Sequence, residues 1–222
     1  MVRDRLFGEE RVVKIGSSSY RLPAAHVSAD LVLLDGIRNI TDGCRLSIND
    51  FGAGVGQYGH ELQRDGCRWH GYDGAGDVDE YTTGLVHFVD LTMPLALPRA
   101  DWVVSLEVGE HVPRQFERAY IENLHVHNCR GVILSWAQPN QPGHGHVNAH
   151  SPAYVRDIFQ ELGYAYDDRL SQAMRNGPGR TWSYHSRPGR EPATDPSGKA
   201  HWWLRGAGVQ VFRKQGGCQR LT

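Results

Sequence analysis

The chain predicts an α/β fold built on a mainly parallel sheet, and three features of its 222 residues lead to that prediction. Apolar segments of strand length alternate with helical segments, as in right-handed strand–helix–strand units. The first of these central strands runs into a glycine-rich turn, residues 52–56, which opens a helix. The last two strand-like segments have no helical pattern between them, so we expect an antiparallel pair at the end of the sheet.

Composition narrows the class of protein. A length of 222 residues suits one domain over residues 1–222. Lys and Arg number 24 against 25 Asp and Glu, and this balance favours a small-molecule substrate over a nucleic-acid partner. Since we find no apolar run of about 18 residues and no apolar leader, we expect no membrane contact and a cytoplasmic location.

The cysteines are expected to be free thiols. Four are present, at Cys44, Cys67, Cys129 and Cys218, and none belongs to a C-x-x-C pair. Such scattered positions are typical of reduced intracellular cysteines rather than of a disulfide framework or a zinc site.

The first elements form an N-terminal cap over residues 1–40. Residues 1–25 read as irregular. A helix is expected to begin after Ser28, which is a suitable N-cap, and to end near Asn39.

The central elements follow in alternation. We expect strands at residues 45–50, 68–73, 85–90, 101–106 and 131–136, and helices at residues 57–65, 78–83, 114–127 and 151–162. The last helix has the clearest ends, because Ser151 is an N-cap, Pro152 occupies the first turn and Gly163 follows the final turn.

The final elements are strands at residues 164–171 and 206–213. A segment rich in Gly, Pro, Ser and Arg, residues 176–199, joins them. If the earlier strand runs parallel to the sheet, this connector emerges at the ligand-binding edge. It is then a flap over the site, or else a surface loop without fixed structure.

Two ligands compete for the glycine-rich turn. The segment from Gly54 to Gly59 satisfies G-x-G-x-x-G, and Asp73 follows at the distance of a ribose-binding acid in dinucleotide sites. However, Asp50 directly precedes the glycines, and Asp90 ends the third strand. A carboxylate close to the turn disfavours a pyrophosphate and favours a cationic amino acid group.

Four segments carry a resemblance to a known family. They are Asp50 to Gly56, Gly71-Tyr72-Asp73, Val89-Asp90-Leu91 and Ser105 to Pro113. With them the chain resembles the class I S-adenosylmethionine-dependent methyltransferases over roughly residues 28–214, and the fourth segment resembles small-molecule enzymes of the ubiquinone-biosynthesis type. The resemblance implies a Rossmann-like, seven-stranded, mostly parallel sheet of order 3-2-1-4-5-7-6, with an antiparallel last strand and helices on both faces.

The resemblance also implies a site for S-adenosylmethionine. Its expected residues are Asp50, Phe51, Gly52, Ala53, Gly54, Asp73, Asp90, Leu91, Leu106 and Glu107. The turn lies against the methionine moiety, Asp50 helps to hold its ammonium, Asp73 accepts from the ribose hydroxyls, and Asp90 faces the adenine amine. The last two residues of the set close the site beneath the sulfonium, and Phe51 is expected to alter packing more than binding.

The expected reaction is in-line methyl transfer to a small molecule, with oxygen favoured as acceptor atom and nitrogen or sulfur as alternatives. It needs alignment and exclusion of water, and a base only where the acceptor loses a proton. The candidate catalytic residues are His146 and His111. The candidate acceptor contacts are Tyr20, Trp136, His144 and Asn148.

Other readings stay open. The sequence predicts no metal site, although three histidines (His144, His146 and His150) or a mixed set (Glu107, Glu110 and His111) offer suitable ligands. An NAD(P)-dependent oxidoreductase and a non-catalytic cofactor-binding subunit are the alternative functions. We expect a monomer or a homodimer.

Overall fold

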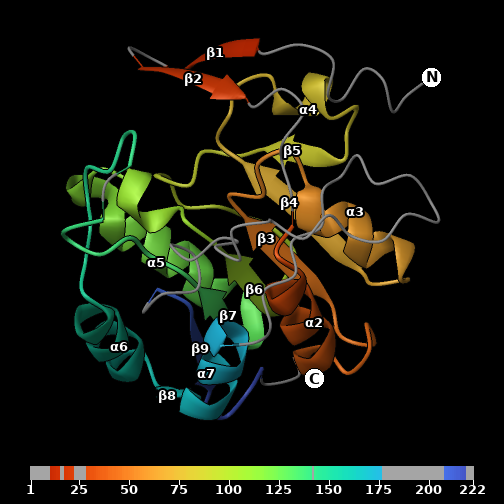
Figure 1. Cartoon of the computed structure of the whole chain (residues 1–222), viewed down its shortest axis with the longest axis vertical. Coiled ribbons are helices and arrows are strands. Elements are labelled where there is room, and N and C mark those ends of the chain that lie inside the picture. Colours follow the sequence, from red (N-terminus) through yellow and green to blue (C-terminus); the bar gives the residue numbers. More distant parts are fainter. Residues whose placement is uncertain (1–10, 16–17, 23–28, 142, 177–207, 219–222) are drawn as a thin grey trace.

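A seven-stranded mixed sheet forms the middle layer of the computed structural model, which describes residues 11–15, 18–22, 29–141, 143–176 and 208–218 (Figure 1). Its strands are β3 (Ile48–Phe51), β4 (Trp69–Asp73), β5 (Val86–Phe88), β6 (Ala100–Ser105), β7 (Asn128–Leu134), β8 (Tyr164–Tyr166) and β9 (Gln210–Lys214).

The strands lie in the order β5-β4-β3-β6-β7-β9-β8. Strands β3 to β7 pair parallel, and β9 pairs antiparallel with both β7 and β8. Counted from β3 as the first strand, this is the order 3-2-1-4-5-7-6. The structure therefore confirms the predicted fold class, including the single antiparallel strand.

Helices cover both faces of the sheet. One face carries α2 (Leu31–Ile40), α3 (Gln57–Arg64), α4 (Val78–Tyr81) and α7 (Asp168–Asn176), whose apolar side chains share a core with Val104 and Ile133. The other face carries α5 (Glu117–Val126) and α6 (Pro152–Glu161), which share a second core with Val103 and Val132. Neighbouring residues of β6 and β7 thus face opposite cores, which explains why these strands are apolar throughout.

Helix starts follow capping chemistry. Ser151 caps α6 as predicted, because its hydroxyl accepts from the backbone N–H of Tyr154 at 3.2 Å. The expected start of the first helix is wrong: Asp30 caps α2 and accepts from Val32 N at 2.8 Å. The predicted cap, Ser28, lies outside the described residues.

Two elements were missed by the sequence prediction. Residues 1–25 were expected to be irregular, yet β1 (Arg11–Ile15) and β2 (Ser18–Leu22) form an antiparallel hairpin. Residues 164–171 were expected to be one strand, yet β8 ends at Tyr166 and α7 follows. Asp167 accepts from Leu170 N at 3.0 Å, so an aspartate before the helix was the available signal. Residues 177–199 of the expected flap lie outside the described residues.

The expectation of free thiols is also wrong. Cys44 pairs with Cys67 and Cys129 with Cys218, with Cα atoms 4.3 and 4.6 Å apart. The first pair joins the segments that precede the adjacent strands β3 and β4, and the second joins the start of β7 to the segment after β9. Sheet topology brings these cysteines together, whereas their spacing along the chain does not reveal it.

Within the described residues, the structure contains no helix with the length and apolar character needed to cross a membrane.

Candidate functional site

The glycine-rich turn between β3 and α3 is held to the end of β4 by its backbone. The N–H groups of Gly52 and Ala53 both donate to the carbonyl of Tyr72, at 2.8 and 3.0 Å. The N–H of Gly54 donates to Oδ2 of Asp73 at 2.7 Å, and Oδ1 of Asp73 accepts from Ala75 at 2.9 Å. Asp73 and the glycines that the sequence singled out are thus joined by hydrogen bonds into one bend.

Space lies above this bend at Gly54. Its φ is +58°, a conformation that favours glycine. A Cβ built there would meet, among the described residues, only Oε1 of Gln57, at 3.5 Å. The backbone can therefore be approached closely by a ligand, as a bound nucleoside amino acid requires.

Asp50 lies beneath the turn rather than on its surface. Its carboxyl is 5% exposed and accepts from the indole N–H of Trp69 at 3.1 Å. Burial raises the pKa of Asp50 to about 7; the Trp69 hydrogen bond opposes this rise and the charge of Asp73 adds to it. A role in holding the cofactor ammonium remains a prediction.

The neighbouring Phe51 is fully buried in the core under α5 and α6, where its ring meets that of Tyr72 edge-on at 5.6 Å. Asp90 follows β5 and is exposed, with Oδ1 accepting from both the N–H and the hydroxyl of Thr92 at 2.9 and 2.6 Å. Leu91 beside it is buried against the second core. Phe51 therefore serves packing, with its carbonyl accepting from the hydroxyl of Ser105 at 2.6 Å, whereas Asp90 is accessible from solvent.

The segment after β6 crosses the same edge of the sheet. Leu106 is half-buried against the first core. Glu107 adopts a φ of +55°, which is unusual for a residue with a side chain. Its N–H donates to the hydroxyl of Ser135 at 2.8 Å, and its Oε2 accepts from the amide of Gln141 at 3.2 Å. Bonds to the end of β7 and to the loop beyond it thus hold Glu107 in this conformation.

Glu110 is a buried acid that lies beside the carboxyl of Glu107. It lies in the 3-10 helix η1 (Gly109–His111) and is 0% exposed. Burial, and next the charge of Glu107, raise the pKa of Glu110 to about 8. Burial of a charged carboxyl is costly, so this carboxyl is poised to take a proton or a cation.

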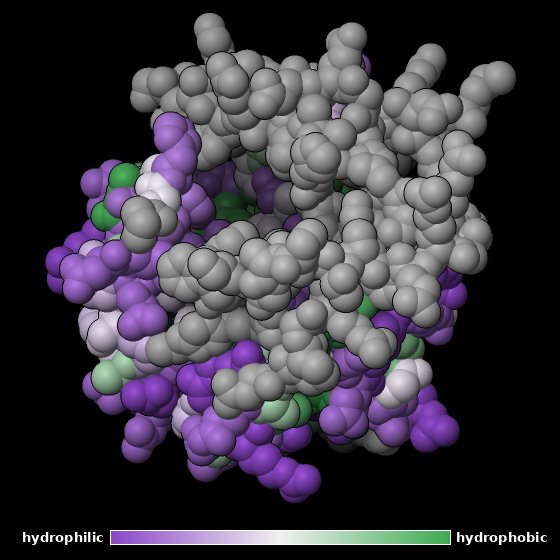
Figure 2. All heavy atoms as spheres, viewed as in Figure 1, coloured by the Kyte–Doolittle hydropathy of each residue, from purple (hydrophilic) through white to green (hydrophobic). Residues whose placement is uncertain are grey.

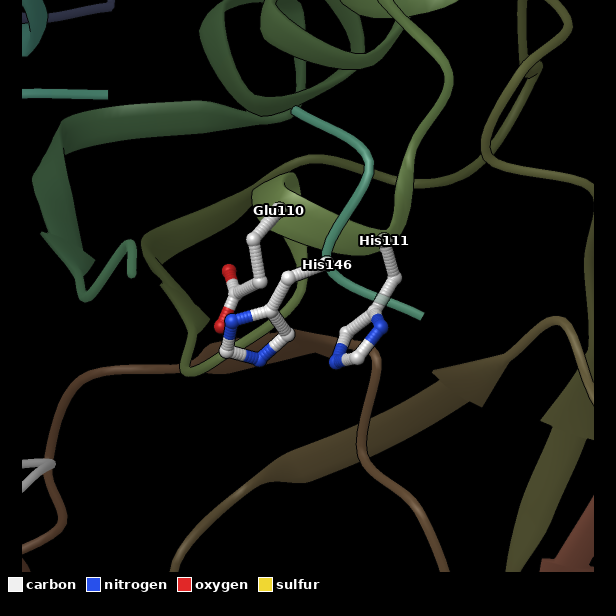
Figure 3. Close-up of side chains that lie close together, drawn as sticks. All are labelled: Glu110, His111 and His146. Carbon is white, nitrogen blue, oxygen red and sulfur yellow. The ribbon is translucent and has the colours of Figure 1, made fainter. Parts of the chain in front are cut away.

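Two imidazoles lie beside that carboxyl. In Figure 3 the side chains of Glu110, His111 and His146 lie on one side of η1 and of the loop after β7, and the His146 ring lies between the other two. The rings of His111 and His146 are 5.1 Å apart. The pKa of His111 is lowered, first by burial and then by His146.

The tautomers of both rings follow from their backbone partners. Nδ1 of His111 lies 3.2 Å from the carbonyl of Gly145, and Nδ1 of His146 lies 3.1 Å from the carbonyl of Gln141. Since a carbonyl only accepts, we assign a proton to Nδ1 of each ring, which leaves Nε2 as the accepting atom of a neutral imidazole.

These three side chains form a possible metal site. Their ligand atoms all lie within 4.8 Å of one another, and no other such group occurs in the part of the chain that the structure describes. A carboxylate with two imidazoles whose second nitrogens bind carbonyls is a donor set that divalent transition metals accept. The alternative cluster of three histidines does not form, because His144 is exposed and His150 binds Glu117.

The loop after β7, residues 137–150, is built around Trp136 and Asn148. The indole of Trp136 is 2% exposed, packs so closely on Gly109 that a Cβ there would lie 2.5 Å away, and donates to the carbonyl of Asn148 at 2.6 Å. Asn148 is itself buried. Both predicted acceptor contacts therefore support the loop in the structure. Tyr20 lies in β2, where side chains are not described.

The sequence prediction missed Glu117. This first residue of α5 accepts hydrogen bonds from the side chains of Asn148, His150 and Tyr154 at 2.7, 2.6 and 2.5 Å. An acid in the first turn of a helix was the available signal, although it is normally read as a favourable dipole contact.

Over the described residues, the face of the molecule in Figure 2 is mainly hydrophilic, with hydrophobic atoms visible between the polar ones.

Comparisons with known proteins show the fold. No protein-family model matches the chain, and no curated protein matches its sequence. Among solved structures it is similar to magnesium protoporphyrin IX methyltransferase from Synechocystis PCC 6803 with bound SAH, at 23% identity and a TM-score of 0.51, over 62% of this chain and 73% of that chain.

A second similar structure is the 1,6-didemethyltoxoflavin-N1-methyltransferase of Burkholderia thailandensis with bound 1,6-didemethyltoxoflavin and S-adenosylhomocysteine. Its identity is 15% and its TM-score 0.51, over 82% of this chain and 76% of that chain. Both likenesses show that this chain shares the fold of these two enzymes.

Proposed function

Starting from its class I methyltransferase fold, we propose that this chain is an S-adenosylmethionine-dependent methyltransferase that acts on a small molecule. The observation that carries the proposal is the bend at residues 52–56, where a Cβ built on Gly54 would meet only Oε1 of Gln57 among the described residues and where the carboxylate of Asp73 accepts from the Gly54 N–H. The two similar structures support it, because their names include a methyltransferase activity and bound S-adenosylhomocysteine or SAH.

The chain's own residues bind and orient in this proposal. S-adenosylmethionine, when bound, supplies a methyl group on a sulfonium. The bend faces the amino acid moiety with its backbone, and Asp73 keeps lone pairs for ribose hydroxyls beyond the two N–H groups it already accepts. Asp90 lies accessible after β5 for the adenine amine. Glu107 and Leu106 form the wall beneath the donor.

The acceptor lies, in this proposal, between the bend and the loop after β7. Nε2 of His146 has a free lone pair and can take the proton of an acceptor hydroxyl. Because a base is present to take the hydroxyl proton, oxygen is the favoured acceptor atom. Nitrogen or sulfur acceptors are the alternatives, and they can react without such a base. His111 of η1, whose ring lies 5.1 Å from that of His146, is the second candidate base, and the exposed His144 of the loop is a further acceptor contact.

A divalent cation fits the cluster of Glu110, His111 and His146, although the sequence predicted no metal. A cation would bind the buried Glu110 carboxylate and the Nε2 atoms of His111 and His146, and a metal-bound His146 would then no longer serve as the base. A metal there would place positive charge beside the acceptor and favour an ionised acceptor oxygen.

Isothermal titration decides the cofactor. We expect the chain to bind S-adenosylhomocysteine and to give no heat with NADH, since a pyrophosphate on the bend would lie close to the carboxylate of Asp73. If NADH gives heat and S-adenosylhomocysteine does not, the proposal is wrong and the chain is an NAD(P)-dependent oxidoreductase. Methyl transfer is then measured with the isolated chain in a panel of small acceptors. An enzyme transfers methyl groups to at least one of them, whereas a non-catalytic subunit transfers none.

Manganese titration followed by electron paramagnetic resonance tests the cation. We expect the wild type to bind Mn²⁺ and Glu110→Gln to bind it about 10- to 100-fold more weakly. His70→Gln is the matched control, because His70 is an exposed histidine on β4 outside the cluster. Equal binding by the wild type and Glu110→Gln would exclude this site.

The finer features of the protein stay predictions. A monomer or homodimer without nucleic-acid partners remains the expected state. The two disulfides argue against the cytoplasmic location predicted from the sequence, because disulfides are typical of oxidising compartments.

A further inference from the structure

Glu117 is a charged residue without a part in the reaction proposed above. It is 8% exposed and begins α5, and like Glu110 it binds Asn148 of the loop after β7. Burial alone would favour its neutral form, but hydrogen bonds from Tyr154, Asn148 and His150 outweigh burial and lower its pKa. Its position at a helix N-terminus also favours the anion.

Three donors converge on this carboxylate. Oε2 accepts from Nδ2 of Asn148 at 2.7 Å and from Nε2 of His150 at 2.6 Å, and Oε1 accepts from the hydroxyl of Tyr154 at 2.5 Å. The His150 ring stacks on the Tyr154 ring with centroids 3.9 Å apart. A neutral amide in place of the carboxylate offers one acceptor oxygen and two hydrogens, so it cannot serve all three donors.

The same loop residues are tied to the His146 cluster. The N–H groups of Val147 and Asn148 donate to the carbonyl of Glu110 at 2.8 and 3.0 Å. The carbonyl of Asn148 accepts from Trp136. Asn148 is therefore held at its N–H, its carbonyl and its side chain, two residues beyond His146. Of these three hydrogen bonds, only the one from the Asn148 side chain is made to the carboxylate of Glu117.

We propose that Glu117 is a positioning residue for the loop after β7. By holding Asn148 and His150 it keeps His146 against Glu110 and His111. The effect on turnover rests on the proposed function, but the effect on the loop does not. Glu117 touches neither cofactor nor acceptor in this role.

Hydrogen exchange of the free protein tests the positioning. In Glu117→Gln we expect the amides of Val147 and Asn148 to exchange at least about tenfold faster, while amides of β6 and β7 keep their rates. Glu122→Gln is the matched control, because Glu122 is an exposed acid on the same helix. Unchanged exchange in the loop, or equal acceleration in loop and sheet, would overturn the proposal.

A second variant covers failure of Glu117→Gln to fold. His150→Phe keeps an aromatic ring for the Tyr154 stack and removes one bond to Glu117, so we expect faster exchange confined to the same loop. If the wild type transfers methyl groups, Glu117→Gln should raise the KM for the acceptor and leave S-adenosylhomocysteine affinity unchanged. If the wild type has no activity, the proposed function fails while the exchange result still decides the role of Glu117.

Discussion

At the scale of single residues, the sequence identified the bend and the acids around it but not what each side chain contacts. Asp73 was expected to face a ribose, and the structure shows that it also holds Gly54 and Ala75. Glu110 appeared only in an alternative metal cluster, yet it is fully buried beside Glu107 and within ligand distance of His111 and His146. Such contacts depend on neighbours from other strands, which spacing along the chain does not reveal.

Gly54→Val tests the bend. A branched side chain above Gly54 would occupy the space proposed for the cofactor, so S-adenosylhomocysteine affinity should fall by about 100-fold or more in isothermal titration. Gly43→Val is the matched control, because Gly43 has a φ of +61° and nothing within 4 Å of a built Cβ. Both variants bear a similar backbone cost of about 1–2 kcal/mol. Equal affinities in the two variants would contradict the site.

Asp50 gives a pH dependence of stability. Its carboxyl titrates at 3.8 when unperturbed, and burial raises the folded pKa to about 7. Between these values the folded chain holds a proton that the unfolded chain releases, so the contribution of Asp50 to the free energy of unfolding falls as the pH rises. Urea titrations from pH 4 to pH 7 should show this fall in the wild type and a flatter curve in Asp50→Asn. Parallel curves would show that Asp50 does not titrate in this range.

At the scale of elements, strands and helices with apolar patterns or clear caps were predicted to within a few residues. The helix at residues 151–162 became α6 with the cap that its sequence indicates. The missed helix α7 has few apolar residues, and Leu170 and Met174 pack on α2 only because β8 ends early. An element stabilised mainly by tertiary contacts leaves a weak local signal.

Ser151→Ala tests the cap of α6. Loss of the hydroxyl that accepts from Tyr154 N should lower the free energy of unfolding by about 1 kcal/mol in urea titration. Ser151→Asn keeps a capping oxygen, and Asn and Ser are about equally good N-caps. Its free energy of unfolding should therefore stay within about a few tenths of a kcal/mol of the wild-type value. A loss as large in Ser151→Asn as in Ser151→Ala would show that the bond to Tyr154 N does not stabilise the helix.

At the scale of the whole molecule, the order of the strands was predicted and the cross-links were not. The family resemblance implied the observed order, in which β9 alone runs antiparallel. The disulfides depend on that order, because adjacent strands bring together cysteines 23 and 89 residues apart in the sequence.

The two disulfides should stabilise the chain to different extents. In the chain-entropy account, a cross-link over 89 residues contributes about 4–5 kcal/mol and one over 23 residues about 3 kcal/mol. Urea titration without reductant should therefore show a larger loss for Cys218→Ser than for Cys67→Ser. Alkylation of the unfolded wild type, followed by mass measurement, should find no free thiol. Four labelled cysteines would contradict the pairing.

The sequence by itself determined the alternation of strands and helices, the glycine-rich bend with its acids, and the cap of α6, because these features are encoded by residues close together in the chain. Only the tertiary structure decided that Glu110 meets His111 and His146, that Glu117 binds the loop after β7, and that all four cysteines pair. The acids and histidines meet at the edge where β6 and β7 end, and the cysteines pair at the opposite edge, where β3, β4 and β7 begin. Sheet pairing brings each of these sets together, and burial between the paired segments decides which polar groups find a partner.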